Sequence, residues 1–160
     1  MEFGARALGC RSILADPRDS SMKERLNRAV KFRESFRPFA PAIKFQAFNQ
    51  FFETSGVECV PYMEKTLQVK ESARNLIPAC VHEDGSARAQ TVKQDEVPEL
   101  YKLLEAFEKE TEIPVLLNTS FNVNGEPIVE SPRDALRTFF SSGLDALVIG
   151  HCVVTKRDCE

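Results

Sequence analysis

The chain of 160 residues has no long apolar run, no closely spaced pair of cysteines and only two histidines. No stretch approaches the roughly 18 consecutive apolar residues of a membrane-spanning helix, and the N-terminus has no apolar signal core. We therefore expect a cytoplasmic protein that makes no membrane contact. The five cysteines include no Cys-x-x-Cys pair of the kind found in zinc and redox sites, so we expect reduced thiols.

The scarcity of histidine restricts the chemistry further. His82 and His151 lie far in sequence from any cysteine or carboxylate cluster with metal-ligand spacing. This argues against a metal held by the chain and against Ser/His or Cys/His nucleophilic catalysis. We predict no metal ligands.

Length and composition are those of one globular domain over residues 1–160. The net charge is -3, and 42% of the residues are hydrophobic. A chain of this length buries roughly two thirds of its unfolded surface, so neither disulfides nor a structural metal are needed for stability.

Positive charge is concentrated at the start of the chain. Residues 1–44 hold ten basic and five acidic side chains, although the whole chain is acidic. This excess suggests an anionic ligand, although several of the basic residues could form the solvated face of a helix. Basic and aromatic residues do not alternate as in a stacking surface, so we expect no nucleic-acid partner.

Hydrophobic spacing and turn signals predict an α/β fold. A helix is expected over 21–30, with Ser21 and Glu24 as a capping box. The other expected elements are an extended segment over 36–41, a short helix with Phe45, Phe48 and Phe52 on one face, strands over 66–70, 87–92, 113–117 and 146–149, a helix from Pro98 with Leu100, Leu103, Leu104 and Phe107 on one face, and a helix capped by Ser131 and Asp134.

Residues 118–122, Asn-Thr-Ser-Phe-Asn, are predicted to form a polar loop after the buried 113–117 strand. Ligands of open α/β sheets bind beyond the carboxyl ends of strands, and Asn118, Thr119, Ser120 and Asn122 offer neutral donors and acceptors. The alternative is that these side chains only cap the loop and the following turn.

Basic residues supply candidates for an anion site. Lys31, Arg33 and Arg37 lie within seven residues, at a predicted helix exit where cations also favourably oppose the helix dipole. Arg37 stands in an apolar, proline-rich segment and is expected to need a buried anionic or carbonyl partner. Arg6 and Arg88 are weaker candidates, and Arg88 is expected to be exposed.

These segments resemble the C-terminal region of the nodulation and antibiotic O-carbamoyltransferase family. The matching stretches cover nearly the whole chain and include MEFGARALGCRSILADPR (1–18), VKFRESFRPFAP (30–41), IPACVHEDGSARAQTV (77–92), IPVLLNTSFNVNGEPIV (113–129) and SPRDALRTFFSSGLDALVIG (131–150). The family's usual proline is replaced by Ala5, and Cys10 stands where Asn or His is common. The chain also begins inside the first motif, so the resemblance suggests a fragment of a larger protein.

The resemblance implies a YrdC-like twisted, open, mixed β-sheet flanked by helices. It also implies a carbamoyltransferase domain that condenses carbamoyl phosphate with ATP, accompanied by Mg²⁺, to give carbamoyl-adenylate. A further N-terminal domain, actin-like and metal-carrying, would transfer the carbamoyl group to a hydroxyl. The family's K-x-R and S-x-N pairs correspond to Lys31 with Arg33 and to Ser120 with Asn122.

The resemblance also suggests roles for the candidates. Lys31, Arg33 and Arg37 would hold the phosphates and the carbamoyl group, and Arg6 would close the same pocket. Asn118, Ser120 and Asn122 would bind the α-phosphate or carbamoyl end. Thr119 is a further candidate for substrate or nucleotide binding, and Arg88 would bind the nucleotide. The alternative function is a nucleotide- or anion-binding module without turnover.

Overall fold

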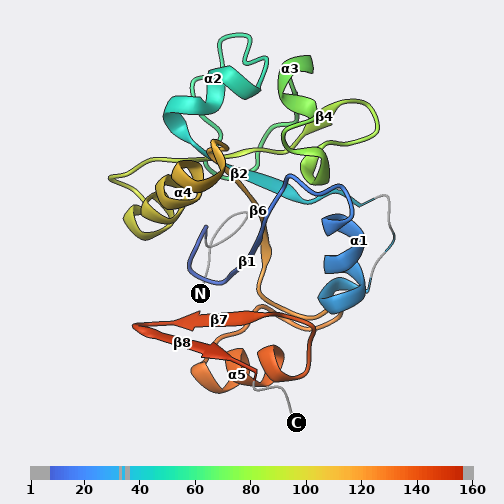
Figure 1. Cartoon of the computed structure of the whole chain (residues 1–160), viewed down its shortest axis with the longest axis vertical. Helices are drawn as coiled ribbons and strands as arrows, with labels where there is room; N and C mark the ends of the chain where they lie inside the picture. Colours follow the sequence, from blue (N-terminus) through green and yellow to red (C-terminus); the bar gives the residue numbers. More distant parts are fainter. Residues whose placement is uncertain (1–7, 33, 35–36, 157–160) are drawn as a thin grey trace.

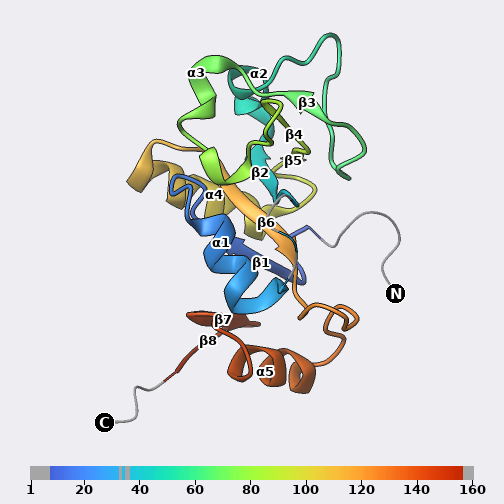
Figure 2. The same cartoon turned by 90° about the vertical axis from the view of Figure 1, so that its right-hand side faces the viewer.

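The computed structural model describes residues 8–32, 34 and 37–156, with the elements arranged in three tiers along the longest axis (Figures 1 and 2). A four-stranded sheet occupies the middle tier. Short helices and a two-stranded sheet lie at one end, and a helix with a β-hairpin lies at the other. No helix in the described part of the chain is long and apolar enough to cross a membrane.

The central sheet is mixed and has the strand order β1-β6-β2-β5. Its strands are β1 (Ser12–Ala15), β6 (Val115–Ser120), β2 (Ala40–Lys44) and β5 (Gln90–Val92). Strand β6 runs antiparallel to both neighbours, whereas β2 and β5 are parallel. The expected α/β class with an open mixed sheet and flanking helices is confirmed.

Helices cover both faces of this sheet. Neighbouring residues of β6 point to opposite faces, so each of them packs in a different cluster. Leu116 packs in a cluster with Leu100 and Leu104 of α4 (Pro98–Thr111). Leu117 packs in a second cluster with Leu26 of α1 (Met22–Leu26) and Val30 of the π-helical segment η1 (Asn27–Lys31). Val30 therefore packs η1 against this face of the sheet, one residue before Lys31.

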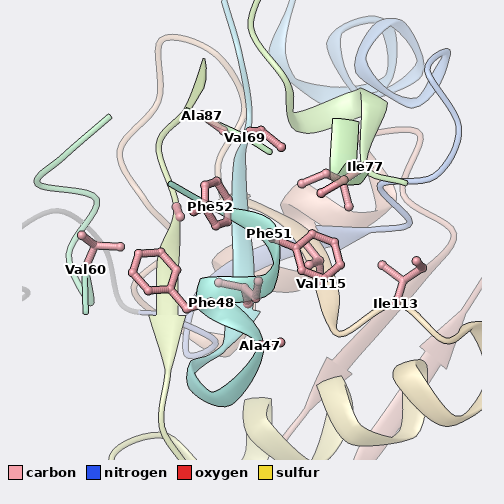
Figure 3. Close-up of a cluster of buried hydrophobic side chains, with 13 residues drawn as sticks. Ala47, Phe48, Phe51, Phe52, Val60, Val69, Ile77, Ala87, Ile113 and Val115 are labelled. Carbon is pink, nitrogen blue, oxygen red and sulfur yellow. The ribbon is translucent and has the colours of Figure 1, made fainter. Parts of the chain in front are cut away.

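Phe48, Phe51 and Phe52 belong to a cluster of buried hydrophobic side chains that also includes Val115 of β6 (Figure 3). Phe48 and Phe52 are 1% exposed, and their ring centroids are 5.4 Å apart. The expected helix is present as η2 (Phe45–Ala47) and α2 (Phe48–Phe51), but Phe52 lies beyond its end in extended backbone. The remaining elements of this tier are β3 (Leu67–Gln68), α3 (Glu71–Arg74), η3 (Pro78–Cys80) and β4 (Ser86–Ala87).

At the opposite end, α5 (Pro132–Phe140) has the expected capping box. The Ser131 hydroxyl accepts from the Asp134 backbone N–H at 3.2 Å, and the Ser131 backbone N–H donates to Asp134 Oδ2 at 3.2 Å. The expected 146–149 strand exists as β7 (Ala146–Ile149), but it is not a core strand. It pairs with β8 (Cys152–Thr155), and Leu147 is its one buried residue.

Three further expectations were wrong. Ser21 makes no side-chain cap, because its hydroxyl donates to Asp19 Oδ2 at 2.7 Å. The predicted 87–92 strand divides into β4 and β5, which belong to different sheets. Leu103 does not lie on the buried face of α4 and is 46% exposed.

Candidate functional site

Lys31 joins the end of the π-helical segment to the end of β6. Its Nζ lies 2.6 Å from the Ser120 carbonyl oxygen, 3.2 Å from Ser120 Oγ, 3.0 Å from the Asn122 carbonyl oxygen and 2.8 Å from Asn122 Oδ1. All four are oxygens of neutral groups. The structure thus brings together Lys31 of the K-x-R pair and both residues of the S-x-N pair, Ser120 and Asn122.

Further hydrogen bonds fix this cluster. Ser120 Oγ donates to Asn122 Oδ1 at 2.6 Å, and Asn122 Nδ2 donates to the Glu126 carbonyl at 2.7 Å. Lys31 is 4% exposed. A buried ammonium requires polar partners, and these neutral oxygens provide them. Lys31 therefore positions the Ser120 and Asn122 side chains relative to each other.

The predicted 118–122 loop is wrong in its first half. Asn118, Thr119 and Ser120 belong to β6, where Asn118 pairs with Leu14 of β1 and Ala40 of β2. Their polarity suggested a loop, but two antiparallel neighbours satisfy the backbone there. Because β6 is antiparallel to both neighbours, the expectation that ligands bind beyond the carboxyl ends of parallel strands does not apply to it.

A cavity of about 330 Å³ lies beside the same part of β6. It is lined by Arg37, Pro38, Phe39, Ala40, Met63, His82, Arg88, Asn118 and Thr119. Four predicted binding residues, Arg37, Arg88, Asn118 and Thr119, therefore share one cavity. Arg6 and Arg33 lie outside the described residues.

The two arginines of this cavity have exposed side chains. Arg88 stands at the break between β4 and β5 and donates to the Met63 carbonyl from Nε at 3.2 Å and from Nη2 at 2.9 Å. Met63 has a φ of 57°, in the left-handed region that residues other than glycine rarely adopt. Arg37 is exposed and has no side-chain hydrogen bond or ion pair among the described residues, so the buried anionic or carbonyl partner that we expected is not found there. Both guanidinium groups can meet an anion from solvent.

Asn118 is 1% exposed and is held by another buried amide. Its Nδ2 donates to Gln90 Oε1 at 2.6 Å, and Gln90 Nε2 donates to the Pro61 carbonyl at 3.4 Å. Asn118 Oδ1 has no hydrogen-bond partner among the described residues. A buried oxygen in this state is uncommon in folded proteins and indicates a place for a donor.

His82 lines the same cavity and was not a candidate from the sequence. Its Nδ1 lies 3.0 Å from Ser86 Oγ, and Ser86 Oγ donates to Asp84 Oδ1 at 2.6 Å. Because the Ser86 proton is directed to Asp84, Ser86 Oγ accepts from His82 Nδ1–H. Burial lowers the pKa of His82 and outweighs the opposing effect of the Asp84 carboxylate. The ring is therefore neutral near pH 7, and Nε2 carries a lone pair.

The arrangement suits the binding of an anion with amide character. Guanidinium groups form charge-assisted hydrogen bonds to phosphate, and the neutral groups of the cavity add donors and acceptors. No group of three or more His, Cys, Asp or Glu side chains in the described part could hold a metal ion.

Comparison with known proteins agrees with the resemblance. A family model described as carbamoyltransferase C-terminus matches residues 1–156. Nodulation protein NolO of Bradyrhizobium diazoefficiens is 49% identical over 157 residues, which cover 98% of this chain and 29% of NolO. The 3'-hydroxymethylcephem-O-carbamoyltransferase of Amycolatopsis lactamdurans is 38% identical over 149 residues, which cover 93% of this chain and 28% of that enzyme. The chain thus spans less than a third of the length of these relatives.

Proposed function

Since the chain belongs to the carbamoyltransferase C-terminus family, we propose that it forms carbamoyl-adenylate within an ATP-dependent O-carbamoyltransferase. The observation that carries the proposal is the meeting of Lys31 with Ser120 and Asn122, beside a cavity that holds Arg37 and Arg88. Lys31 lies 89 positions from Ser120 and 91 positions from Asn122 in the sequence, so the cluster forms only when the chain folds.

The reaction has two balanced steps. Water hydrolyses carbamoyl phosphate: the linkage between the carbamoyl group and the phosphate breaks, and carbamate, inorganic phosphate and a proton are formed. A carbamate oxygen then attacks the α-phosphorus of ATP, the bond to the bridging oxygen between the α- and β-phosphates breaks, and pyrophosphate leaves with that electron pair. Negative charge grows on the phosphate oxygens, so electrostatic stabilisation is the main contribution required of the protein.

The cavity residues fit this requirement. Arg88 and Arg37 offer guanidinium groups to phosphate oxygens, and Asn118 and Thr119 add neutral polar groups. Lys31 holds Ser120 and Asn122 in place at the end of β6. Mg²⁺ would arrive with ATP on the phosphate oxygens, and none of these steps requires a side-chain nucleophile.

Transfer of the carbamoyl group is proposed to occur in another, metal-carrying domain of the same protein. The acceptor is proposed to be a hydroxyl group, since one relative is named for O-carbamoylation of a hydroxymethyl compound. The alternative, an anion-binding module without turnover, has the same cavity but forms no adenylate.

Exchange of labelled pyrophosphate into ATP, with carbamoyl phosphate present, distinguishes the proposed adenylate-forming domain from the anion-binding module. We expect exchange by the wild-type chain and a loss of about tenfold or more in Ser120→Ala, which removes a polar group next to Lys31. Ser72→Ala, on the exposed side of α3, is the matched control. ATP binding in calorimetry without any exchange would support the binding module instead.

A further inference from the structure

Two hydrogen-bond acceptors on one cavity have no partner in the structure as described. One is Oδ1 of Asn118 and the other is Nε2 of His82, and both atoms are buried. They come from distant parts of the chain, β6 and the turn that precedes β4. Buried polar atoms without partners are rare, so two on one cavity require an explanation.

The neighbouring hydrogen bonds determine that both atoms accept. The Nδ2 group of Asn118 is directed to Gln90, which leaves Oδ1 as the free end of the amide. The proton on His82 Nδ1 is directed to Ser86 Oγ, which leaves Nε2 with its lone pair. A ligand that satisfies both atoms must donate two hydrogens, and an uncharged amino group does so.

Resting on the function proposed above, we propose that His82 and Asn118 accept hydrogen bonds from the amino group of the carbamoyl substrate and so select carbamoyl over other acyl groups. In carbamate the amino group and the anionic oxygens share one carbon. The two acceptors likewise share their cavity with the Arg37 and Arg88 side chains. The amino group of adenine is a poorer fit, because the purine and the ribose separate it from the phosphates.

This pairing has a direct consequence for specificity. Acetyl phosphate has nearly the shape of carbamoyl phosphate, but a methyl group replaces the amino group and donates nothing. Bound acetyl phosphate would leave Asn118 Oδ1 and His82 Nε2 buried without partners. Sites built to bond a polar group reject an analogue that lacks it far more strongly than apolar pockets reject an extra methylene.

The test is pyrophosphate exchange supported by carbamoyl phosphate or by acetyl phosphate, measured on the wild-type chain, His82→Phe and His82→Gln. We expect the wild type to prefer carbamoyl phosphate by about a hundredfold or more, and His82→Phe to reduce this preference by about tenfold or more. His82→Gln, which retains an oxygen acceptor, should keep more of the preference. Both rates come from one preparation, so their ratio does not depend on the fraction of folded protein.

Other results would overturn the assignment. An unchanged preference in His82→Phe would show that His82 does not contact the amino group. A weaker ATP affinity with unchanged preference would place His82 at the nucleotide. Absence of both exchange and ATP binding in the wild type is a different result, because it refutes the proposed function on which this assignment rests.

Discussion

Lys31 donates a hydrogen bond of 2.8 Å to Oδ1 of Asn122, a residue 91 positions further along the chain. The same Nζ contacts both oxygens of Ser120. One side chain thus connects the π-helical segment η1 to the end of β6, and the candidate site depends on that connection.

Lys31→Ala should lower the free energy of unfolding by about 2 kcal/mol, because it removes hydrogen bonds from a buried charged donor. It should also abolish most of the exchange activity. Urea unfolding measures the first effect. Lys65→Ala is a suitable control, since Lys65 is exposed, and it should leave both quantities unchanged. Equal unfolding midpoints for the two variants would contradict the structural role of Lys31.

Arg88→Ala should weaken ATP binding about tenfold, because a charge-assisted hydrogen bond to phosphate is lost. Stability should change little, since the side chain is exposed and its described contact is to one carbonyl. Calorimetric titration gives the affinity. Arg133→Ala, on the exposed start of α5, should bind like wild type. Identical ATP affinities for the two variants would remove Arg88 from the site.

Ser131→Ala should lower the free energy of unfolding by about 1 kcal/mol, because it removes the N-cap of α5. Ser21→Ala should cost less, since Ser21 precedes α1 without capping it. Urea unfolding of both variants measures the difference. A larger effect at Ser21 would favour the capping box expected from the sequence over the observed contacts.

Between pH 7.5 and 5.5 the folded state should lose stability through His82. Burial lowers the pKa of His82 in the folded state relative to an unfolded histidine, so the unfolded chain binds the proton more readily. The contribution is complete above the ordinary histidine pKa and is lost as the pH falls below it. Urea unfolding at several pH values should show a weaker pH dependence in His82→Gln. The same slope in both proteins would show that other groups are responsible.

Cys80 should resist alkylation in the folded protein, whereas Cys10 and Cys152 should react. Cys80 is fully buried, and burial raises the pKa of its thiol, so little reactive thiolate forms. Cys10 and Cys152 are exposed. Treatment with iodoacetamide followed by peptide mass spectrometry distinguishes the three. Labelling of Cys80 at the rate of Cys10 would contradict its placement in the core.

Local signals predicted the elements that depend on neighbouring residues. The helix α5 follows from Ser131, Pro132 and Asp134, and α4 from Pro98 and the apolar spacing behind it. The extent of β6 could not be predicted in this way, since Asn118 belongs to a strand only because β1 and β2 lie on either side. The apolar run at 146–149 predicted a strand correctly, but the strand pairs in a hairpin with β8 and is not a core strand.

The candidate site divides in the same way. The family resemblance selected Lys31, Ser120 and Asn122 as residues around the nucleotide, but it did not predict that they contact one another. Spacing alone left open that Ser120 and Asn122 only cap a loop. His82 could not be found, because the sequence shows neither the direction of the Ser86 proton nor an acceptor without a partner. The available signal was the spacing of His82, Asp84 and Ser86, which lie two residues apart from one another.

The position of Asn118 within β6 also affects the thermodynamics of association. Its backbone is ordered by a strand on each side, paired at Leu14 and Ala40. Ordering the backbone of one residue costs about 1–2 kcal/mol of conformational entropy. At Asn118 the backbone is already ordered when the protein folds, so this cost does not arise on ligand binding. A small ligand that docks against this strand therefore does not have to immobilise the backbone that meets it.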